Sequence, residues 1–471
     1  MSARSPDELQ RDAADPRASV WVAASAGAGK TKVLTDRVLT LLLNGSQPTR
    51  LLSLTFTRAA AAEMANRLHT RLSDWAVLDD TSLGEELRKL LGRLAGKDDL
   101  DRARRLFATV LDAPGGLRIA TIHAFCQSLL RRFPVEAGVP PHFEPMDERA
   151  ANELMLSARE EVLVRAREAR AGPLADAVGM LAGRLGETGF GDLLHKIARM
   201  RGRFAALEAA EGGLAGAPAR LAARLGIPPG TTEDRVIAEA CEETGFDGAA
   251  LRRAAEALLR SKAKGDNDSG RRVAEWLAEP QRRAERFDDY LLVYFTGKAE
   301  PRARLVTASV AKANPELLEA LETERRRLDA VRERRVAAAH LEATSAVLHL
   351  AGAILDSYSR LKQSRAVLDY EDLIQRSIDL LGQPEVSPWV LFKLDGGLDH
   401  LLIDEAQDTS PDQWRVVEAL TREFFAGTGA RETARTVFAV GDVKQSIFSF
   451  QGADPEKFLE MREHFARLAT E

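Results

Sequence analysis

The residues best suited to chemistry form a stretch of small side chains near the start of the chain. They are Ala24, Ser25, Ala26, Gly27, Ala28, Gly29, Lys30 and Thr31. Small side chains let backbone N–H groups turn inward around phosphate oxygens, and a helix that starts there directs its positive end at the same anion. The lysine would reach the β- and γ-phosphates, and the threonine hydroxyl would bind Mg²⁺. The stretch therefore predicts a phosphate-binding loop.

The loop departs from the usual pattern at one position, because Ala24 stands where that pattern begins with glycine. Apolar residues 20–23 before it and the helical pattern of residues 33–43 after it supply the strand and the helix that such a loop needs. The alternative interpretation is a tight Gly/Ala turn that merely precedes a helix. The flanking strand and helix favour the phosphate loop.

A pair of carboxylates follows an apolar run late in the chain. Residues 400–403 have the composition of a buried strand, and Asp404 and Glu405 come directly after it. Ligands bind at the carboxyl ends of strands in open α/β sheets. Asp404 can then hold Mg²⁺, and Glu405 can orient and deprotonate an attacking water. The alternative is an acidic helix start that satisfies free N–H groups.

A parallel sheet is required to bring the loop and the carboxylates together. We expect strands at residues 20–24, 51–57, 118–121, 400–404 and 436–442. We expect helices between them at residues 32–43, 59–72 and 124–133. Strands that alternate with helices in this way predict an α/β domain with a parallel sheet.

Residues 142–360 interrupt this pattern with apolar side chains spaced three and four apart, which predicts a helical insertion. Neither Gly nor Pro occurs between Pro315 and Gly352, and as one helix that stretch would span roughly 54 Å. Residues 262–270 are rich in turn formers and predict a mobile loop. We expect a sheet domain in two parts, residues 1–140 and 363–471, separated by a helical accessory domain at residues 141–362.

Composition limits the remaining possibilities. The net charge is −5, so a nucleic-acid footprint must be a local patch. The two cysteines, Cys126 and Cys241, lie far apart and exclude a disulfide framework or a Cys-rich metal site within this chain. Residues 1–15 are polar, and no run reaches about 18 apolar residues. We therefore expect a cytoplasmic protein without a secretory signal or a membrane span.

In their order along the chain, these residues resemble the UvrD/RecB-like helicases of superfamily 1. Further segments that are similar to motifs of that family lie at residues 54–64, 120–126, 368–373 and 441–453. Within the family, residues 122–134, the long insertion and residues 451–455 resemble the AddA branch of bacterial helicase–nuclease subunits. The resemblance implies a RecA-like P-loop NTPase domain with a parallel sheet, split by a mostly helical inserted accessory domain.

The resemblance also implies roles in nucleotide binding and hydrolysis. Gln10 would read the adenine edge, residues 24–31 and Lys32 would surround the nucleotide, and Thr31 and Asp404 would hold Mg²⁺. The catalytic residues would be Lys30, Asp404, Glu405 and Gln445. Two positions differ from many relatives, which carry arginine where this chain has Lys32 and Gln451. The first change puts stacking on adenine in question, and the second removes a cation near the site.

A surface for single-stranded DNA follows from the same resemblance. Thr57, Arg58 and His123 would contact the DNA backbone. Phe56, Phe448 and Phe450 would stack on bases. Such stacking tolerates any sequence, because every base has a π-face. The alternative interpretation of the three phenylalanines is packing in a hydrophobic core.

The resemblance thus implies the ATP-binding motor half of a 3′–5′ DNA helicase for double-strand-break repair and recombination. It would use ATP and Mg²⁺, act on single- or double-stranded DNA ends, and pair with an AddB-like nuclease subunit in the bacterial cytoplasm. We expect the second RecA-like domain and the nuclease domain to be absent from this chain, and the chain alone to hydrolyse little ATP. The alternative is a non-hydrolysing module that binds ATP and single-stranded DNA or docks on a partner. A small-molecule P-loop kinase explains neither the aromatic motif nor the split sheet.

Overall fold

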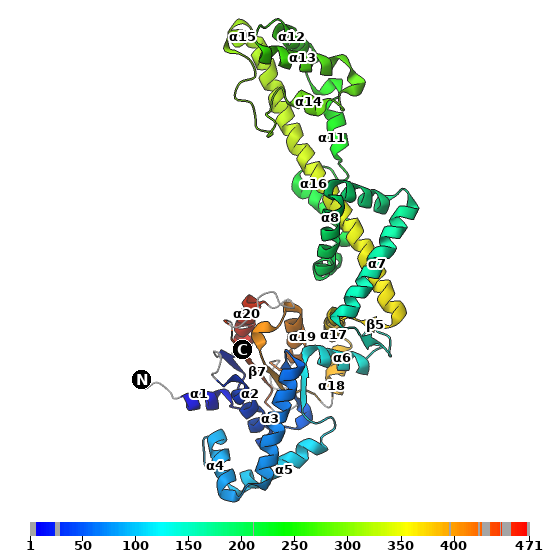
Figure 1. Cartoon of the computed structure of the whole chain (residues 1–471). Coiled ribbons are helices and arrows are strands. Elements are labelled where there is room, and N and C mark those ends of the chain that lie inside the picture. The colour runs from blue at the N-terminus through cyan, green and yellow to red at the C-terminus, as the bar shows by residue number, and fades with distance from the viewer. Residues whose placement is uncertain are drawn as a thin grey trace, which may run out of the picture. The chain divides into compact units, whose positions relative to one another are not determined.

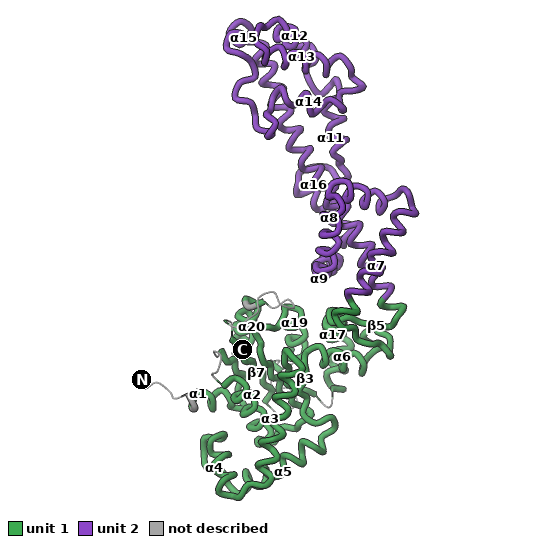
Figure 2. Tube along the Cα trace, in the orientation of Figure 1, with its two compact units in different colours: residues 1–151, 362–471 green, residues 152–361 purple. Residues whose placement is uncertain are grey.

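The chain divides into two compact units in its computed structural model. Unit 1 comprises residues 1–151 and 362–471, and unit 2 comprises residues 152–361 (Figure 2). Figure 1 traces the chain by residue number. The residues described are 6–23, 29–210, 212–394, 397–422, 424–425, 434–442, 444 and 454–468.

Unit 1 is built on a five-stranded parallel sheet with the order β1-β7-β6-β2-β3. Its strands are β1 (Val20–Ala23), β2 (Leu51–Thr55), β3 (Arg118–Thr121), β6 (His400–Ile403) and β7 (Thr436–Gly441). The predicted parallel sheet is confirmed, and its register pairs Leu54 with Ile403 and Val22 with Val440. A separate two-stranded parallel ladder joins β4 (Glu144–Pro145) and β5 (Val367–Leu368). Segments more than 400 residues apart in the sequence, β1 and β7, therefore pair in one sheet.

Helices cover both faces of this sheet, because successive strand side chains point to opposite sides. Leu401 and Ile403 pack on one face, beside α6 (Ile122–Arg132), α17 (Tyr370–Gly382), α18 (Ser387–Lys393), α19 (Pro411–Thr421) and α20 (Pro455–Leu468). Leu402 and Phe438 pack on the other, beside α2 (Lys30–Leu43), α3 (Arg58–Val77), α4 (Asp80–Leu91) and α5 (Lys97–Asp112). A further helix, α1 (Pro6–Ala13), precedes β1. Burial on both faces explains why the strands read as continuous apolar runs.

All five strands end at the same edge of the sheet, since they are parallel. Helix α2 is the next described helix after β1, α3 follows β2, and α6 follows β3 directly. The start of each helix presents N–H groups without partners in the helix. Among the described residues, those predicted to bind ligands therefore lie at this edge, apart from Gln10, which belongs to α1.

Unit 2 consists mainly of α-helices. Its helices are α7 (Glu148–Ala169), α8 (Pro173–Arg199), α9 (Arg201–Ala209), α10 (Gly213–Leu225), α11 (Glu233–Ala240), α12 (Gly248–Leu259), α13 (Lys264–Ala278), α14 (Phe287–Leu291), α15 (Ala308–Ala313) and α16 (Pro315–Arg365). Trp276 stacks on Tyr290 with ring centroids 4.0 Å apart, and the Tyr290 hydroxyl donates to Glu324 Oε1 at 2.8 Å. Arg327 bonds the same carboxylate, so the buried charge is paired.

The predicted loop at residues 262–270 is wrong, because α13 starts at Lys264 and runs through it. Asp266 is buried and accepts hydrogen bonds from the backbone and the hydroxyl of Thr307, a partner 41 residues away. A Cβ on Gly270 would lie 2.8 Å from Leu258 Cβ, so glycine here permits close packing of α13 on α12. Tertiary contacts thus stabilise a helix in a sequence that is rich in turn formers.

Helix α16 is longer than predicted, because it continues past Gly352 to Arg365. It is also long and apolar enough to cross a bilayer by length and composition, with a mean hydropathy of 1.3 over its most apolar window. A core helix of a soluble protein meets the same two criteria. In α16, 39% of that window is buried, and Leu321, Leu328 and Leu341 of the helix lie in the core of unit 2.

Candidate nucleotide-binding site

The start of α2 is shaped to receive an anion. Gly29, its N-cap residue, has a left-handed φ of 83°, which glycine adopts without strain. The first turn of α2 contains no acidic side chain, so the positive end of the helix dipole is not neutralised. Lys30 and Thr31 are the first two residues of the helix. The predicted loop residues 24–28 lie outside the described residues.

Lys30 and Glu405 form an ion pair at this edge of the sheet. Lys30 Nζ donates to Glu405 Oε2 at 3.0 Å, although 375 residues separate the two in sequence. The lysine side chain is 10% exposed and the glutamate side chain 37% exposed. The start of α2 and the end of β6 therefore meet, as the positions of the two motifs predicted.

Asp404 lies beside this pair and is largely shielded from water. Its backbone N–H donates to Leu54 O at 2.9 Å, and its carboxylate accepts from the N–H of Glu405 at 3.0 Å. Burial and the neighbouring Glu405 raise the pKa of Asp404 to about 6, against the opposing effect of Lys30. A buried carboxylate of this kind gains from a nearby cation.

The side chains at this edge fit a nucleotide-bound Mg²⁺. Such an ion takes one or two protein oxygens and completes its shell with water and phosphates. The carboxylate of Asp404 and the hydroxyl of Thr31 are ligands of the right type. Within the described part of the chain, no group of three or more His, Cys, Asp or Glu residues is arranged to hold a metal alone. The donor set thus suits a metal that arrives with a nucleotide.

A residue without a predicted role, Gln407, holds Glu405 in place. Gln407 Nε2 donates to Glu405 Oε2 at 2.8 Å, and Gln407 Oε1 accepts from the N–H of Asp442 at 2.9 Å. Glu405 itself has φ 48° and ψ 44°, a conformation that costs energy for a non-glycine residue. The only sequence signal was the position of Gln407, two residues after the predicted base. Gln407 can bridge Glu405 and Asp442 only because β6 pairs with β7.

Gln10 and Lys32 meet beside Gly29. Lys32 Nζ donates to Gln10 Oε1 at 2.7 Å, and Gln10 Nε2 would lie 3.2 Å from a Cβ placed on Gly29. The residue predicted to read adenine is therefore adjacent to the residues predicted to bind phosphate. Gln445, one of the predicted catalytic residues, lies outside the described residues, as does Gln451.

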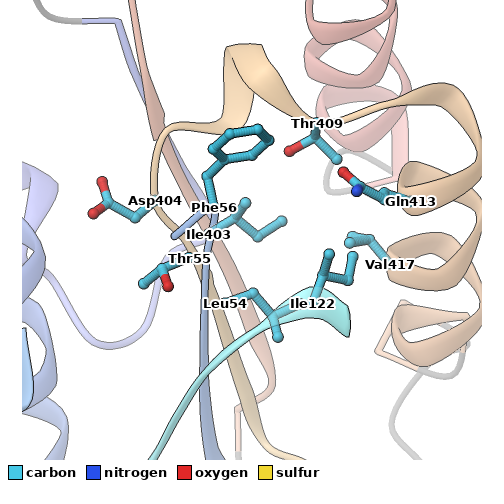
Figure 3. Close-up of a pocket in the computed structure, with 9 residues that line it drawn as sticks. All are labelled: Leu54, Thr55, Phe56, Ile122, Ile403, Asp404, Thr409, Gln413 and Val417. Carbon is cyan, nitrogen blue, oxygen red and sulfur yellow. The ribbon is translucent and has the colours of Figure 1, made fainter. Parts of the chain in front are cut away.

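Phe56 lies at the carboxyl end of β2 and lines a small cavity with Ile403, Gln413 and Val417 (Figure 3). The cavity volume is about 20 Å³, which is room for about one water molecule. Figure 3 places the Phe56 ring between Asp404 and the start of α19. The ring is half-buried.

The other predicted DNA contacts lie at helix starts on the same edge. The Thr57 hydroxyl accepts from Ala60 N at 3.1 Å and caps α3, and Arg58 next to it is exposed. The His123 ring lies 5.0 Å from the ring of Tyr370, and burial lowers the pKa of His123, which favours the neutral imidazole. Phe448 and Phe450 lie outside the described residues.

A parallel sheet whose carboxyl edge joins a glycine-capped helix, a lysine and paired carboxylates is the arrangement of an α/β nucleotide-binding domain. The chain belongs to the UvrD/REP helicase N-terminal domain family, whose profile matches residues 6–466. This match covers both units.

Curated relatives agree with this membership. The AddA subunit of the ATP-dependent helicase/nuclease of Pelotomaculum thermopropionicum is 26% identical over 95% of this chain and 35% of its own length. The corresponding proteins of Desulforudis audaxviator and Moorella thermoacetica are 29% and 28% identical over 94% and 96% of this chain. This chain spans about a third of the length of these relatives.

Proposed function

We propose that this chain is the ATP-binding motor part of an ATP-dependent 3′–5′ DNA helicase of the AddA type. The observation that carries the proposal is the contact between Lys30 at the start of α2 and Glu405 at the end of β6. This ion pair supports the proposal that Lys30 is a cation for phosphates and Glu405 a base for water. The family membership and the names of the relatives support the same function.

In this proposal each of the described residues has its own role in phosphoryl transfer. ATP with Mg²⁺, when bound, supplies the γ-phosphoryl group and neutralises charge on its oxygens. The Lys30 ammonium leaves the Glu405 carboxylate and binds the β- and γ-phosphates. Thr31 and Asp404 are the side chains that would hold the metal. Glu405 then accepts the proton of the attacking water, while Gln407 keeps its carboxylate oriented. Gln445 is proposed as the γ-phosphate sensor.

The same edge is proposed to bind single-stranded DNA. Arg58 is exposed at the start of α3, and Phe56 is half-buried beside it. An arginine for phosphates and an aromatic ring for bases are the two elements of sequence-tolerant strand binding. Thr57, His123, Phe448 and Phe450 remain proposed contacts of that strand.

The wider role is proposed from the relatives. Residues 141–362 are proposed as an accessory domain inserted into a RecA-like domain made of residues 1–140 and 363–471. Because the relatives carry the name of an ATP-dependent helicase/nuclease, we propose DNA ends as the substrate and an AddB-like protein as the partner. The cellular process that we propose for the chain is double-strand-break repair and recombination in the bacterial cytoplasm.

Nucleotide-dependent DNA binding tests the proposal. Fluorescence anisotropy with labelled oligo(dT) should show salt-sensitive binding whose affinity changes when Mg²⁺ and the ATP analogue AMP-PNP are added, because a motor couples its two sites. The Lys30→Met variant should bind DNA with no response to the nucleotide. Identical DNA affinity with and without saturating AMP-PNP in the wild type would contradict a motor function.

A further inference from the structure

One carboxylate on α2 binds two cations at once. Asp36 Oδ2 lies 3.4 Å from Lys32 Nζ, and Asp36 Oδ1 accepts from Arg71 of α3. Arg71 also lies 3.8 Å from Glu86 of α4, which pairs with Lys89 at 3.0 Å. Asp36 is 9% exposed, so its ion pairs are only weakly screened by salt. Five charges therefore alternate in sign from the start of α2 to the surface of α4.

Lys32 is the member of this series that lies beside the proposed nucleotide site. It is the third residue of α2, two positions after Lys30, and its side chain is 57% exposed. A cation in the first turn of a helix adds to the positive potential that attracts an anion there. The Asp36 carboxylate, one turn further along α2, opposes that potential. Because the two side chains are paired, Asp36 offsets much of the charge of Lys32.

Arg71 makes the contact between Lys32 and Asp36 reversible. A buried carboxylate that loses its only cation is strongly destabilised, because its charge is left uncompensated. Asp36 keeps Arg71 when Lys32 turns away, so the Lys32 ammonium can bind a phosphate without leaving Asp36 unpaired. The guanidinium carbon of Arg71 lies 5.7 Å from the ring of buried Trp75, which holds this second cation in place. Asp36 therefore attracts Lys32 but does not require it.

We propose that Asp36 competes with a bound nucleotide for the Lys32 ammonium group and thereby limits how tightly the nucleotide is held. The inference rests on the proposed nucleotide site. It makes Asp36 a positioning residue that acts through Lys32 and does not touch the nucleotide. Product release is the slow step of many enzymes, and a motor must release its nucleotide in every cycle. A carboxylate that weakens the hold on the nucleotide favours that release.

Calorimetric titration of the 471-residue chain with Mg·AMP-PNP and with Mg·ADP tests this inference. Asp36→Asn keeps the shape of the side chain but removes its charge. It should tighten the binding of both nucleotides by about two- to fivefold, the range of a partly exposed ion pair. Asp36→Glu keeps the charge and should bind both nucleotides as the wild type does. In the Lys32→Met background, Asp36→Asn should lose most of its gain, because the cation that it frees is missing.

Arg71→Met provides a test with the opposite sign. It removes the second cation of Asp36, so Asp36 should hold Lys32 more firmly, and nucleotide binding should weaken by about two- to fivefold. Asp36→Asn and Arg71→Met break the same ion pair between α2 and α3, so a purely structural role would change nucleotide affinity in the same direction in both. Urea denaturation establishes that each variant is folded at the titration temperature. Asp74→Asn, on an exposed position of α3, is the control and should not change the affinity.

The alternative outcomes separate the inference from the site itself. Unchanged or weaker binding by folded Asp36→Asn, or a gain that persists in full in the Lys32→Met background, would overturn the inference alone. If Asp36→Asn does not fold, Arg71→Met decides, and an affinity equal to that of the wild type overturns the inference. A wild-type chain that binds neither nucleotide would overturn the inference together with the proposed nucleotide site.

Discussion

The side-chain amide of Gln407 joins the proposed catalytic base to the neighbouring strand. Its Oε1 accepts from the backbone N–H of Asp442 at 2.9 Å, and its Nε2 donates to Glu405 at 2.8 Å. Gln407 is 1% exposed, so neither bond competes with bulk water. The position of Glu405 therefore depends on the end of β7 as well as on its own strand.

Gly441, the last residue of β7, should not tolerate a side chain. An added Cβ would lie 2.6 Å from Gln407 Oε1 and 3.0 Å from Phe458 Cε2. We expect Gly441→Ala to lower the free energy of unfolding by about 1–3 kcal/mol, the usual cost of overpacking. Urea denaturation measures this, with Gly382→Ala as the control, because a Cβ there has open space. Equal stability of the two variants would show that the strand end relaxes freely.

Replacement of the proposed base should leave nucleotide binding intact. Glu405→Gln removes the charge that holds Lys30, and a partly exposed ion pair of this kind is worth about 0–1 kcal/mol. We therefore expect Mg·ATP binding as tight as that of the wild type, or up to about fivefold tighter, in calorimetric titrations. Glu385→Gln, on an exposed residue, is the control. Loss of ATP affinity in Glu405→Gln would indicate that the carboxylate binds nucleotide instead.

Phe56→Ala should distinguish base stacking from core packing. Loss of a stacked base costs about 1–3 kcal/mol of single-stranded DNA binding, whereas loss of a core phenylalanine costs about 3–5 kcal/mol of stability. We expect the binding loss in anisotropy titrations and only a minor change in urea denaturation. Phe392→Ala, on a residue that is 61% exposed, is the matched control for removing an aromatic ring. A large stability loss with unchanged DNA affinity would assign Phe56 to the core.

His400 should make unit 1 less stable in acid. Its Nδ1 lies 2.8 Å from Thr436 Oγ1, and burial together with the nearby Arg37 lowers the pKa of His400 to about 4. The unfolded chain binds this proton near pH 6.5, so stability is retained above that pH and is lost as the pH falls towards 4. The full loss would be about 3 kcal/mol.

Urea denaturation between pH 7 and pH 4 measures the contribution of His400. We expect His400→Gln to flatten this part of the pH profile, because glutamine binds no proton. His69→Gln, on an exposed helix position, should keep the wild-type slope. A His400→Gln profile parallel to that of the wild type would assign the acid sensitivity to other groups.

The sequence predicted the sheet well because buried parallel strands are continuous apolar runs. The bounds of β6 and the start of α2 lie within two residues of those predicted. Parallel strands end at the same edge of a sheet, and this alone predicted that the end of β6 and the start of α2 lie close together. The prediction of a loop at residues 262–270 was wrong because Asp266 forms a hydrogen bond with Thr307. Local composition cannot reveal such a tertiary contact. The Gln407 bridge was missed for the same reason, since it requires β7 beside β6.

The central claim is that Lys30 belongs to a nucleotide site at the carboxyl edge of the sheet. Calorimetric titration of the purified chain with Mg·AMP-PNP tests it most directly, with Lys30→Met compared against Lys89→Met on an exposed surface of α4. The account predicts saturable binding by the wild type and by Lys89→Met, and loss of binding by Lys30→Met. Equal affinity of all three proteins, or no binding by the wild type, would contradict it.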